Sequence, residues 1–153
     1  MSMYSIISEG IKDAMRSKNR DRLAALRDIK SKLMLEASKT GAEGDDIDDA
    51  TAMAILNKLF KQRNETADLY AEQGRSDLEQ EERAQAAVIE EFLPKQLSEG
   101  EIQERVEAII EQENASSMAD MGRVMAAATS SMAGQADGKL IAAFVKSSLM
   151  NRK

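Results

Sequence analysis

The sequence predicts an all-α protein. The chain of 153 residues is 42% hydrophobic but only 3% aromatic, with ten methionines, one proline and eight glycines. An aliphatic interior with so few helix breakers is typical of packed helices. Apolar residues recur at helical spacing almost throughout, and no stretch alternates apolar and polar residues long enough to predict a strand. The length suits one ordinary domain or two very small ones.

A helical hairpin is predicted at the start of the chain, from about residue 2 to 16 and from 20 to 39. The apolar faces of its two helices are Ile7, Ile11, Ala14 and Met15, and Leu23, Leu26, Ile29, Leu33 and Ala37. Gly41 and Gly44 end this hairpin. The start of the chain has no uninterrupted apolar run, so we expect neither a signal peptide nor a membrane span, and a soluble cytoplasmic protein.

Two further helices are predicted before the only proline. Asp48 and Asp49 can cap the third helix, and Gly74 can end it in a left-handed conformation. Ser76 with Glu79 has the pattern of a capping box at the start of the fourth. The apolar stripe of the third helix consists of Met53, Leu56, Leu59, Phe60, Ala67 and Tyr70.

A domain boundary is predicted at Pro94. This proline cannot continue the fourth helix, and it biases the preceding residue away from helical angles. A fresh capping box, Ser98 with Glu101, then opens a fifth helix. We therefore predict a four-helix N-terminal domain over 1–93 and a small three-helix C-terminal domain over 94–153.

The C-terminal domain is expected to end in a pair of helices. Ser117 with Asp120 opens the sixth helix, Gly134 can close it, and Asp137 can cap the seventh. The stretch GQADGKL, residues 134–140, is therefore first of all a helix stop followed by a helix start. The seventh helix carries apolar residues at Leu140, Ile141, Phe144, Val145 and Leu149.

The residue inventory gives no support for catalysis. There is no cysteine and no histidine, which excludes disulfides, thiolate nucleophiles, histidine bases and most transition-metal sites. The serine pairs at 116–117, 130–131 and 147–148 lack a base, and we interpret them as caps and solvated helix surface. The acidic stretch 41–49 lacks the pattern of a calcium loop and is expected to be a solvated loop with a helix cap. We predict no catalytic residue, no metal and no cofactor.

The positive charges are unevenly distributed in a chain of net charge −6. Residues 12–32 contain eight basic and three acidic residues, and after Asn114 five basic residues stand against two acidic ones. Lys and Arg that neutralise phosphates provide most sequence-independent affinity for nucleic acid. The alternative for the basic hairpin 12–32 is a charged solvent face.

The candidate nucleic-acid-binding residues lie in the last third of the chain. Gly122, inside a predicted helix, is unfavourable there and suggests close packing or close approach of a ligand. Free amides at the helix start beside Lys139 could bind phosphate, although Asp137 opposes an anion and tight helix packing is the alternative. The full set of candidates is Gly122, Arg123, Lys139, Lys146, Arg152 and Lys153.

Several segments carry a resemblance to a known family. FLPKQLSEGEI (92–102), DMGRVMAAA (120–128) and GQADGKLIAAFVKSSL (134–149) resemble the GatB/YqeY family. LRDIKSKL (26–33) and KQRNETADLYAEQGRSDLEQEE (61–82) resemble the N-terminal half of its stand-alone YqeY-like members. The resemblance covers almost the whole chain. Its C-terminal part is also similar to the tail domain of the B subunit of glutamine-dependent Asp/Glu-tRNA amidotransferase.

The resemblance implies a tRNA-binding or amidotransferase-associated accessory protein, related to carbon–nitrogen ligases that use glutamine as amide donor. In the amidotransferase, the tail contacts tRNA while the chemistry occurs elsewhere. One departure weakens the RNA interpretation, because a basic residue is expected in the family's GxADG pattern at Gln135. The alternative is a protein-interaction module that docks on an aminoacyl-tRNA synthetase or amidotransferase without touching RNA.

Overall fold

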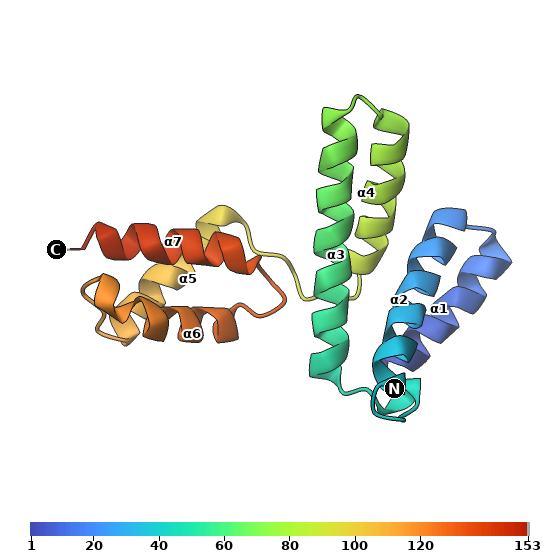
Figure 1. Cartoon of the computed structure of the whole chain (residues 1–153), viewed down its shortest axis with the longest axis horizontal. Coiled ribbons are helices and arrows are strands. Elements are labelled where there is room, and N and C mark those ends of the chain that lie inside the picture. The colour runs from blue at the N-terminus through green and yellow to red at the C-terminus, as the bar shows by residue number, and fades with distance from the viewer. Residues whose placement is uncertain (153) are drawn as a thin grey trace. The chain divides into compact units, whose positions relative to one another are not determined.

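The computed structural model describes residues 1–152 and is helical in every regular element of that range (Figure 1), which confirms the all-α prediction. The chain divides into two compact units, Met1–Leu93 and a second unit that begins at Pro94. Each unit has its own cluster of buried apolar side chains. No helix in the described range is long and apolar enough to cross a membrane.

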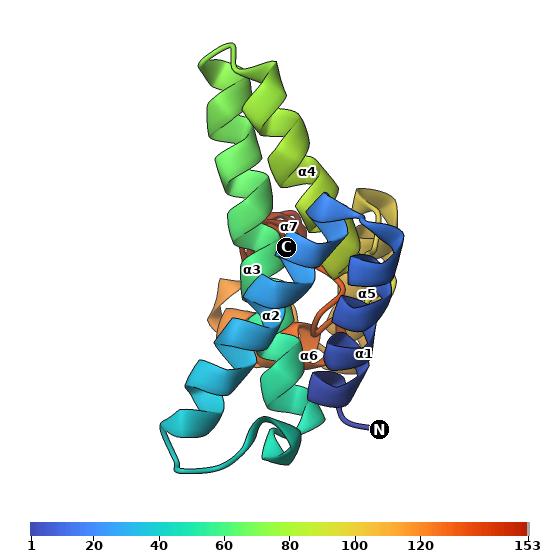
Figure 2. The ribbon, with the colours of Figure 1, turned by 90° about the vertical axis from the view of Figure 1, so that its right-hand side faces the viewer.

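The N-terminal unit consists of four α-helices and a short 3-10 turn. Its helices are α1 (Met3–Ser17), α2 (Arg20–Ser38), α3 (Asp49–Glu72) and α4 (Ser76–Glu90). The helices α1 and α2 form one antiparallel hairpin, and α3 and α4 form a second that extends past the first (Figure 2). The core between the hairpins includes Ile7, Leu26, Ile29, Leu33, Leu56, Leu59 and Ile89.

Two predictions about this unit are wrong. Met15 was placed on the buried face of α1, but it is 54% exposed because it lies about 80° around the helix from Ile7. The predicted capping box at the start of α4 does not form, since Ser76 is already helical and the N-cap is Arg75. The backbone N–H of Arg75 donates to Tyr70 O at 2.9 Å and so completes the end of α3 beside Gly74, whose φ is +71° as predicted.

The acidic stretch 41–49 is exposed at its acidic residues and caps α3, as predicted, but it is also folded against α1. It contains a 3-10 turn, η1 (Gly44–Asp46), and the hydroxyls of Ser2 and Ser5 donate to Asp45 Oδ1 at 2.6 and 2.7 Å. These hydrogen bonds lower the pKa of Asp45. A Cβ at Gly44 would collide with the ring of Tyr4, so the turn packs directly against α1. Asp48 caps α3 as predicted, accepting from Thr51 N at 2.7 Å.

The C-terminal unit packs three α-helices around an aliphatic core. Its elements are α5 (Glu99–Gln112), the 3-10 turn η2 (Met118–Asp120), α6 (Met121–Ser131) and α7 (Gly138–Met150). The capping box of Ser98 and Glu101 forms as predicted. That of Ser117 and Asp120 also forms, but it caps η2 rather than α6. The core includes Ile102, Val106, Ile110, Val124, Ala128, Met132, Ile141, Val145 and Leu149.

The connection between α6 and α7 differs slightly from its prediction. The helix α6 ends at Ser131, with Met132 as its C-cap, so Gly134 lies in the loop beyond it with φ +78°. Asp137 is the N-cap of α7, as predicted, and accepts from Lys139 N at 3.1 Å. The two helices run antiparallel (Figure 1), so α6 begins at the end of the unit where α7 finishes.

Candidate nucleic-acid interface

The candidate residues occupy different ends of the α6–α7 hairpin. Gly122 and Arg123 lie in the first turn of α6, whereas Lys139 lies in the first turn of α7, at the opposite end of the antiparallel pair. Lys146 lies two turns further along α7, and Arg152 follows the end of that helix. Lys153 lies outside the described residues. The candidates therefore do not form one compact cluster, and each has to be judged by its own surroundings.

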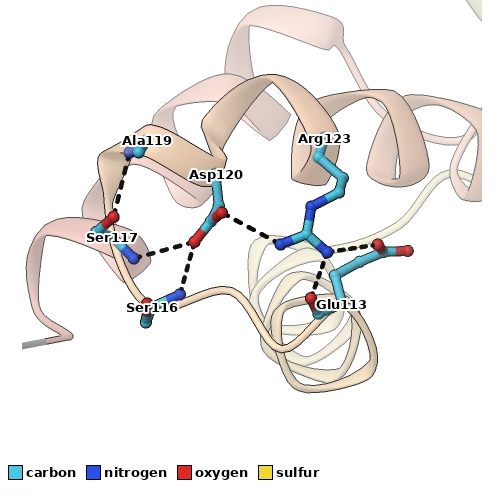
Figure 3. A network of polar contacts seen from close by, with 6 residues as sticks. All are labelled: Glu113, Ser116, Ser117, Ala119, Asp120 and Arg123. Carbon is cyan, nitrogen blue, oxygen red and sulfur yellow. Dashed lines mark hydrogen bonds and ion pairs between the residues drawn. The ribbon is translucent and has the colours of Figure 1, made fainter.

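Arg123 connects the end of α5 to the beginning of α6 (Figure 3). Its guanidinium donates to the backbone carbonyl of Glu113, to Glu113 Oε2 at 3.1 Å and to Asp120 Oδ1 at 3.2 Å. The carbonyl of Glu113 is at the C-cap of α5, where helical carbonyls lack partners within the helix. Arg123 supplies that partner, and its side chain remains 49% exposed.

Asp120 completes the same network from the other side (Figure 3). Its Oδ2 accepts the backbone N–H of Ser116 at 2.9 Å and that of Ser117 at 3.4 Å. The bond from Ser116, followed by the one from Arg123, lowers the pKa of Asp120. Arg123 therefore faces a carboxylate and holds the α5–α6 turn in place. The sequence signal for this role was the acidic residue three positions before the arginine.

The GQADGKL stretch is attached to the segment that leads into α5. Gln96 Nε2 donates to Gly134 O at 2.7 Å, and the backbone N–H of Leu97 donates to Gln135 O at 2.9 Å. The side chain of Gln135 donates to Lys95 O at 3.3 Å and accepts from Arg105 at 3.4 Å. Two of the motifs behind the family resemblance thus meet in space. Gln135, where a basic residue was expected, has a structural partner on each side.

Arg152 is also held by a carboxylate. Its Nη2 lies 2.6 Å from Glu107 Oε2, which joins the residues after α7 to α5. This bond, followed by one from the hydroxyl of Ser148, lowers the pKa of Glu107. Gln103 Nε2 donates to both Glu107 and Ser148, at 2.9 and 3.0 Å. These contacts assign Arg152 a role in fastening α7 to α5.

The glycines that suggested tight packing are in fact open. A Cβ built at Gly122 or at Gly138 would have no neighbouring atom within 4 Å. The helices α6 and α7 do pack against each other, but close packing does not explain a glycine at either of these two positions. Both residues are exposed, and both lie at the start of a helix, where alanine would fit without displacing anything.

Lys139 and Lys146 are the candidates that remain unengaged by a carboxylate among residues 1–152. Both are exposed, and seven residues separate them, so they lie on one face of α7 about 10 Å apart. Ala143 is exposed between them, and its small side chain does not obstruct access to the two lysines. We call Lys139, Ala143 and Lys146 the α7 ridge. It offers two cationic groups to an anion without an ion pair having to break.

The described residues provide no group of three or more potential ligands that could hold a metal ion. A depression of about 220 Å³ in the N-terminal unit is lined by charged, polar and apolar side chains, and Arg63 within it already pairs with Asp28 and Glu82 at 3.1 and 3.0 Å.

Comparison with known protein families gives one result. A family described as Yqey-like protein matches residues 5–149 of the chain, which includes both units. No curated protein matches it.

Proposed function

Because the chain belongs to the family of YqeY-like proteins, we propose that it is a non-catalytic accessory protein that binds structured RNA, with tRNA as the RNA concerned. The similarity of residues 94–153 to the tail domain of a tRNA amidotransferase subunit supports this class of ligand. It also supports a place beside carbon–nitrogen ligase systems that use glutamine as amide donor. In this proposal the chemistry belongs to a partner enzyme, and this chain holds RNA.

The observation that carries the proposal is the α7 ridge. The ammonium groups of its two lysines are exposed and form no ion pair with any of residues 1–152, while Arg123 and Arg152 are engaged with Glu113, Asp120 and Glu107. Phosphate contacts by lysine do not need a preformed fork of donors, because the ammonium acts as a compact charge. The surface around Gly138 is open, which favours approach of a bulky backbone to the beginning of α7.

The unit as a whole is not strongly positive, and this affects what kind of binding is expected. Between Pro94 and Lys153 there are seven basic and eight acidic residues. A modest number of phosphate contacts, positioned by shape, fits this balance better than wrapping by a uniformly basic surface. Arg123 and Arg152 then serve the binding surface indirectly, because they join the start of α6 and the end of α7 to α5 and its C-cap.

The test replaces Lys139 and Lys146 together by glutamine in the full chain. Binding to bulk tRNA is measured by fluorescence anisotropy between 50 and 200 mM salt. Each lost duplex-like phosphate contact should flatten the slope of log affinity against log salt by about 0.9, hence by about 1.8 for the pair. A control with Lys39→Gln and Lys58→Gln removes the same charge from exposed positions elsewhere, at the C-cap of α2 and within α3. Equal affinity and slope for both variants would refute the role of the ridge.

A second candidate function, protein docking, is favoured by two exposed methionines. Met118 in η2 is 40% exposed and Met150 at the end of α7 is 57% exposed, and η2 packs against α7. Flexible methionines at an exposed surface are typical of adaptable protein contacts. Capture of a synthetase or amidotransferase that survives nuclease treatment and is lost with Met118→Gln and Met150→Gln would favour this alternative.

A further inference from the structure

The structure separates the eight basic residues of the segment 12–32 into engaged and free groups. Lys12 pairs with Glu9, Arg16 with Asp13, and Arg22 with Glu91 of α4. Lys30 lies 5.4 Å from the centre of the Tyr4 ring, and Lys32 borders the depression around Arg63. The cations of this segment left without a carboxylate or ring partner among the described residues are Lys18, Arg20, Arg27 and Lys32.

The free arginines share the outward face of α2. Arg20 and Arg27 are seven residues apart, hence two turns and about 10 Å along the helix. Ala24 is exposed between them and Ser31 follows one turn later, and these small side chains do not obstruct a partner that approaches the face. The buried stripe of α2, which includes Leu26, Ile29 and Leu33, points the opposite way. Lys18 adds a third charge at the exposed turn before α2.

The same arrangement of residue types occurs on α7. Arg20, Ala24 and Arg27 have the spacing of Lys139, Ala143 and Lys146: a cation, an alanine four residues later and a cation three residues after that. All six side chains are exposed. We call the first set the α2 ridge. Each unit therefore presents one helix face with two free cations separated by a small side chain.

We propose that the α2 ridge is a second contact for the phosphate backbone of the same RNA. This inference rests on the proposed function. Two weak contacts within one chain act together, because binding at one raises the effective concentration of the ligand at the other. Arginine is well suited to the α2 ridge, since its planar fork can donate two hydrogen bonds to one phosphate.

The alternative occupant of this face is an acidic segment of a protein. Met34 and Leu35, further along α2, are 51% and 59% exposed and would give such a partner an apolar contact. They lie beyond the two arginines rather than between them. The cations and the small residues between them form the continuous part of the face, which matches a regularly charged backbone better than an amphipathic peptide.

The test compares three double variants of the full chain for binding to bulk tRNA. The α2-ridge variant is Arg20→Gln with Arg27→Gln, and the α7-ridge variant is Lys139→Gln with Lys146→Gln. The matched control, Lys12→Gln with Arg75→Gln, removes two cations that are exposed but ion-paired. We expect the α2-ridge variant to lose at least about tenfold in affinity and to flatten the salt slope by about 1.8, while the control changes both much less.

A second variant guards against loss of fold at the ridge. Ala24→Glu leaves both arginines in place, keeps a good helix former at an exposed position and puts a negative charge between them. It should weaken tRNA binding with unchanged helicity by circular dichroism. Unaltered binding in a folded Ala24→Glu protein would overturn the proposed contact.

The remaining outcomes distinguish this inference from the proposed function. If the α7-ridge variant loses affinity and the α2-ridge variant matches the control, the second contact is refuted and RNA binding stands. If the unaltered protein does not bind tRNA, both fail. If the α2-ridge variant weakens tRNA binding without changing the salt slope, the phosphate contact is refuted. The same holds if polyglutamate binds the protein more tightly than tRNA does and displaces tRNA, which would favour an acidic protein partner.

Discussion

Gly122 and Gly74 show that the same substitution should have opposite effects at two residues. Gly122 is helical with open space where a Cβ would stand, so Gly122→Ala should raise the free energy of unfolding by about 0.5–1 kcal/mol. Gly74 also has open space, but its φ of +71° is strained for alanine, so Gly74→Ala should lower it by about 1 kcal/mol. Urea denaturation measures both, and equal signs would contradict this reasoning.

The carboxylate of Glu107 should make stability depend on pH. Hydrogen bonds from Arg152 and Ser148 hold its pKa below the ordinary 4.5. The stabilisation is therefore fully present above about pH 4.5 and is lost as the pH falls through the lower value in the folded protein. Glu107→Gln should be less stable than the unaltered protein at pH 6, with the difference shrinking toward pH 3. A constant difference in unfolding free energy across that range would show that the contact contributes nothing.

The positive charge of the candidate residues could be predicted from the sequence, but the carboxylates with which they pair could not. It selected Arg123 and Arg152 because positive residues accumulate near the chain end, yet both are bound to carboxylates from other parts of the unit. Glu107 is 45 residues away from Arg152 in the chain. A partner so distant becomes visible only when the packing of α5 against α7 is known, and the lack of an ion pair at Lys139 and Lys146 among the described residues likewise became visible only in the structure.

The contacts of Arg63 connect three helices of the N-terminal unit. From α3 it reaches Asp28 of α2 and Glu82 of α4, and the three side chains are only 20–27% exposed. Arg63→Met would leave two partly buried carboxylates without their donor, and we expect it to lower the unfolding free energy by about 1–3 kcal/mol.

Substitution of an exposed arginine separates the effect of leaving partly buried carboxylates unpaired from the effect of losing any ion pair. Arg75 pairs with Asp77 in a geometry where the side chains are 55% and 68% exposed, so Arg75→Met should cost less than about 0.5 kcal/mol. Adding Asp28→Asn and Glu82→Gln to Arg63→Met should recover part of the loss. Similar denaturation midpoints for the two arginine variants would mean that the Arg63 contacts do not stabilise the helices.

A helix start could be predicted from its capping motif where the preceding residues are not needed to end another helix. Ser98 and Glu101 follow Pro94 and form their capping box undisturbed. The equivalent pattern at Ser76 fails, because the three-residue connection between α3 and α4 is fully used by the left-handed Gly74 and the closing bond of Arg75. A local motif predicts a cap correctly only if enough residues connect the helix to the one before it.

At the scale of the whole molecule, the linking segments are expected to be the points of first cleavage. Residues 93–98 join the two compact units, and 41–49 joins the two hairpins of the first. A protease of broad specificity should cut in one of these segments first, leaving fragments that keep their helical circular dichroism. Initial cuts inside 50–73 or 101–113 would argue against this organisation.

The fold class followed from the sequence because helical periodicity, few aromatics and few breakers all indicate the same architecture. The contacts that fasten the elements did not follow. The acidic stretch reads as a solvated loop, yet Asp45 is bound by Ser2 and Ser5, forty or more residues earlier. Local patterns determine which elements form, while the partners of their polar groups depend on tertiary packing.

We propose above that free cations on α7, together with those on α2, contact RNA phosphates. The most direct measurement is the affinity of the unaltered full chain for bulk tRNA as a function of salt. Two phosphate contacts from each ridge predict a slope of log affinity against log salt of about −3.6, and the α7 ridge alone predicts about −1.8. Absence of binding at 50 mM salt, or an affinity that does not change up to 200 mM, would contradict the account.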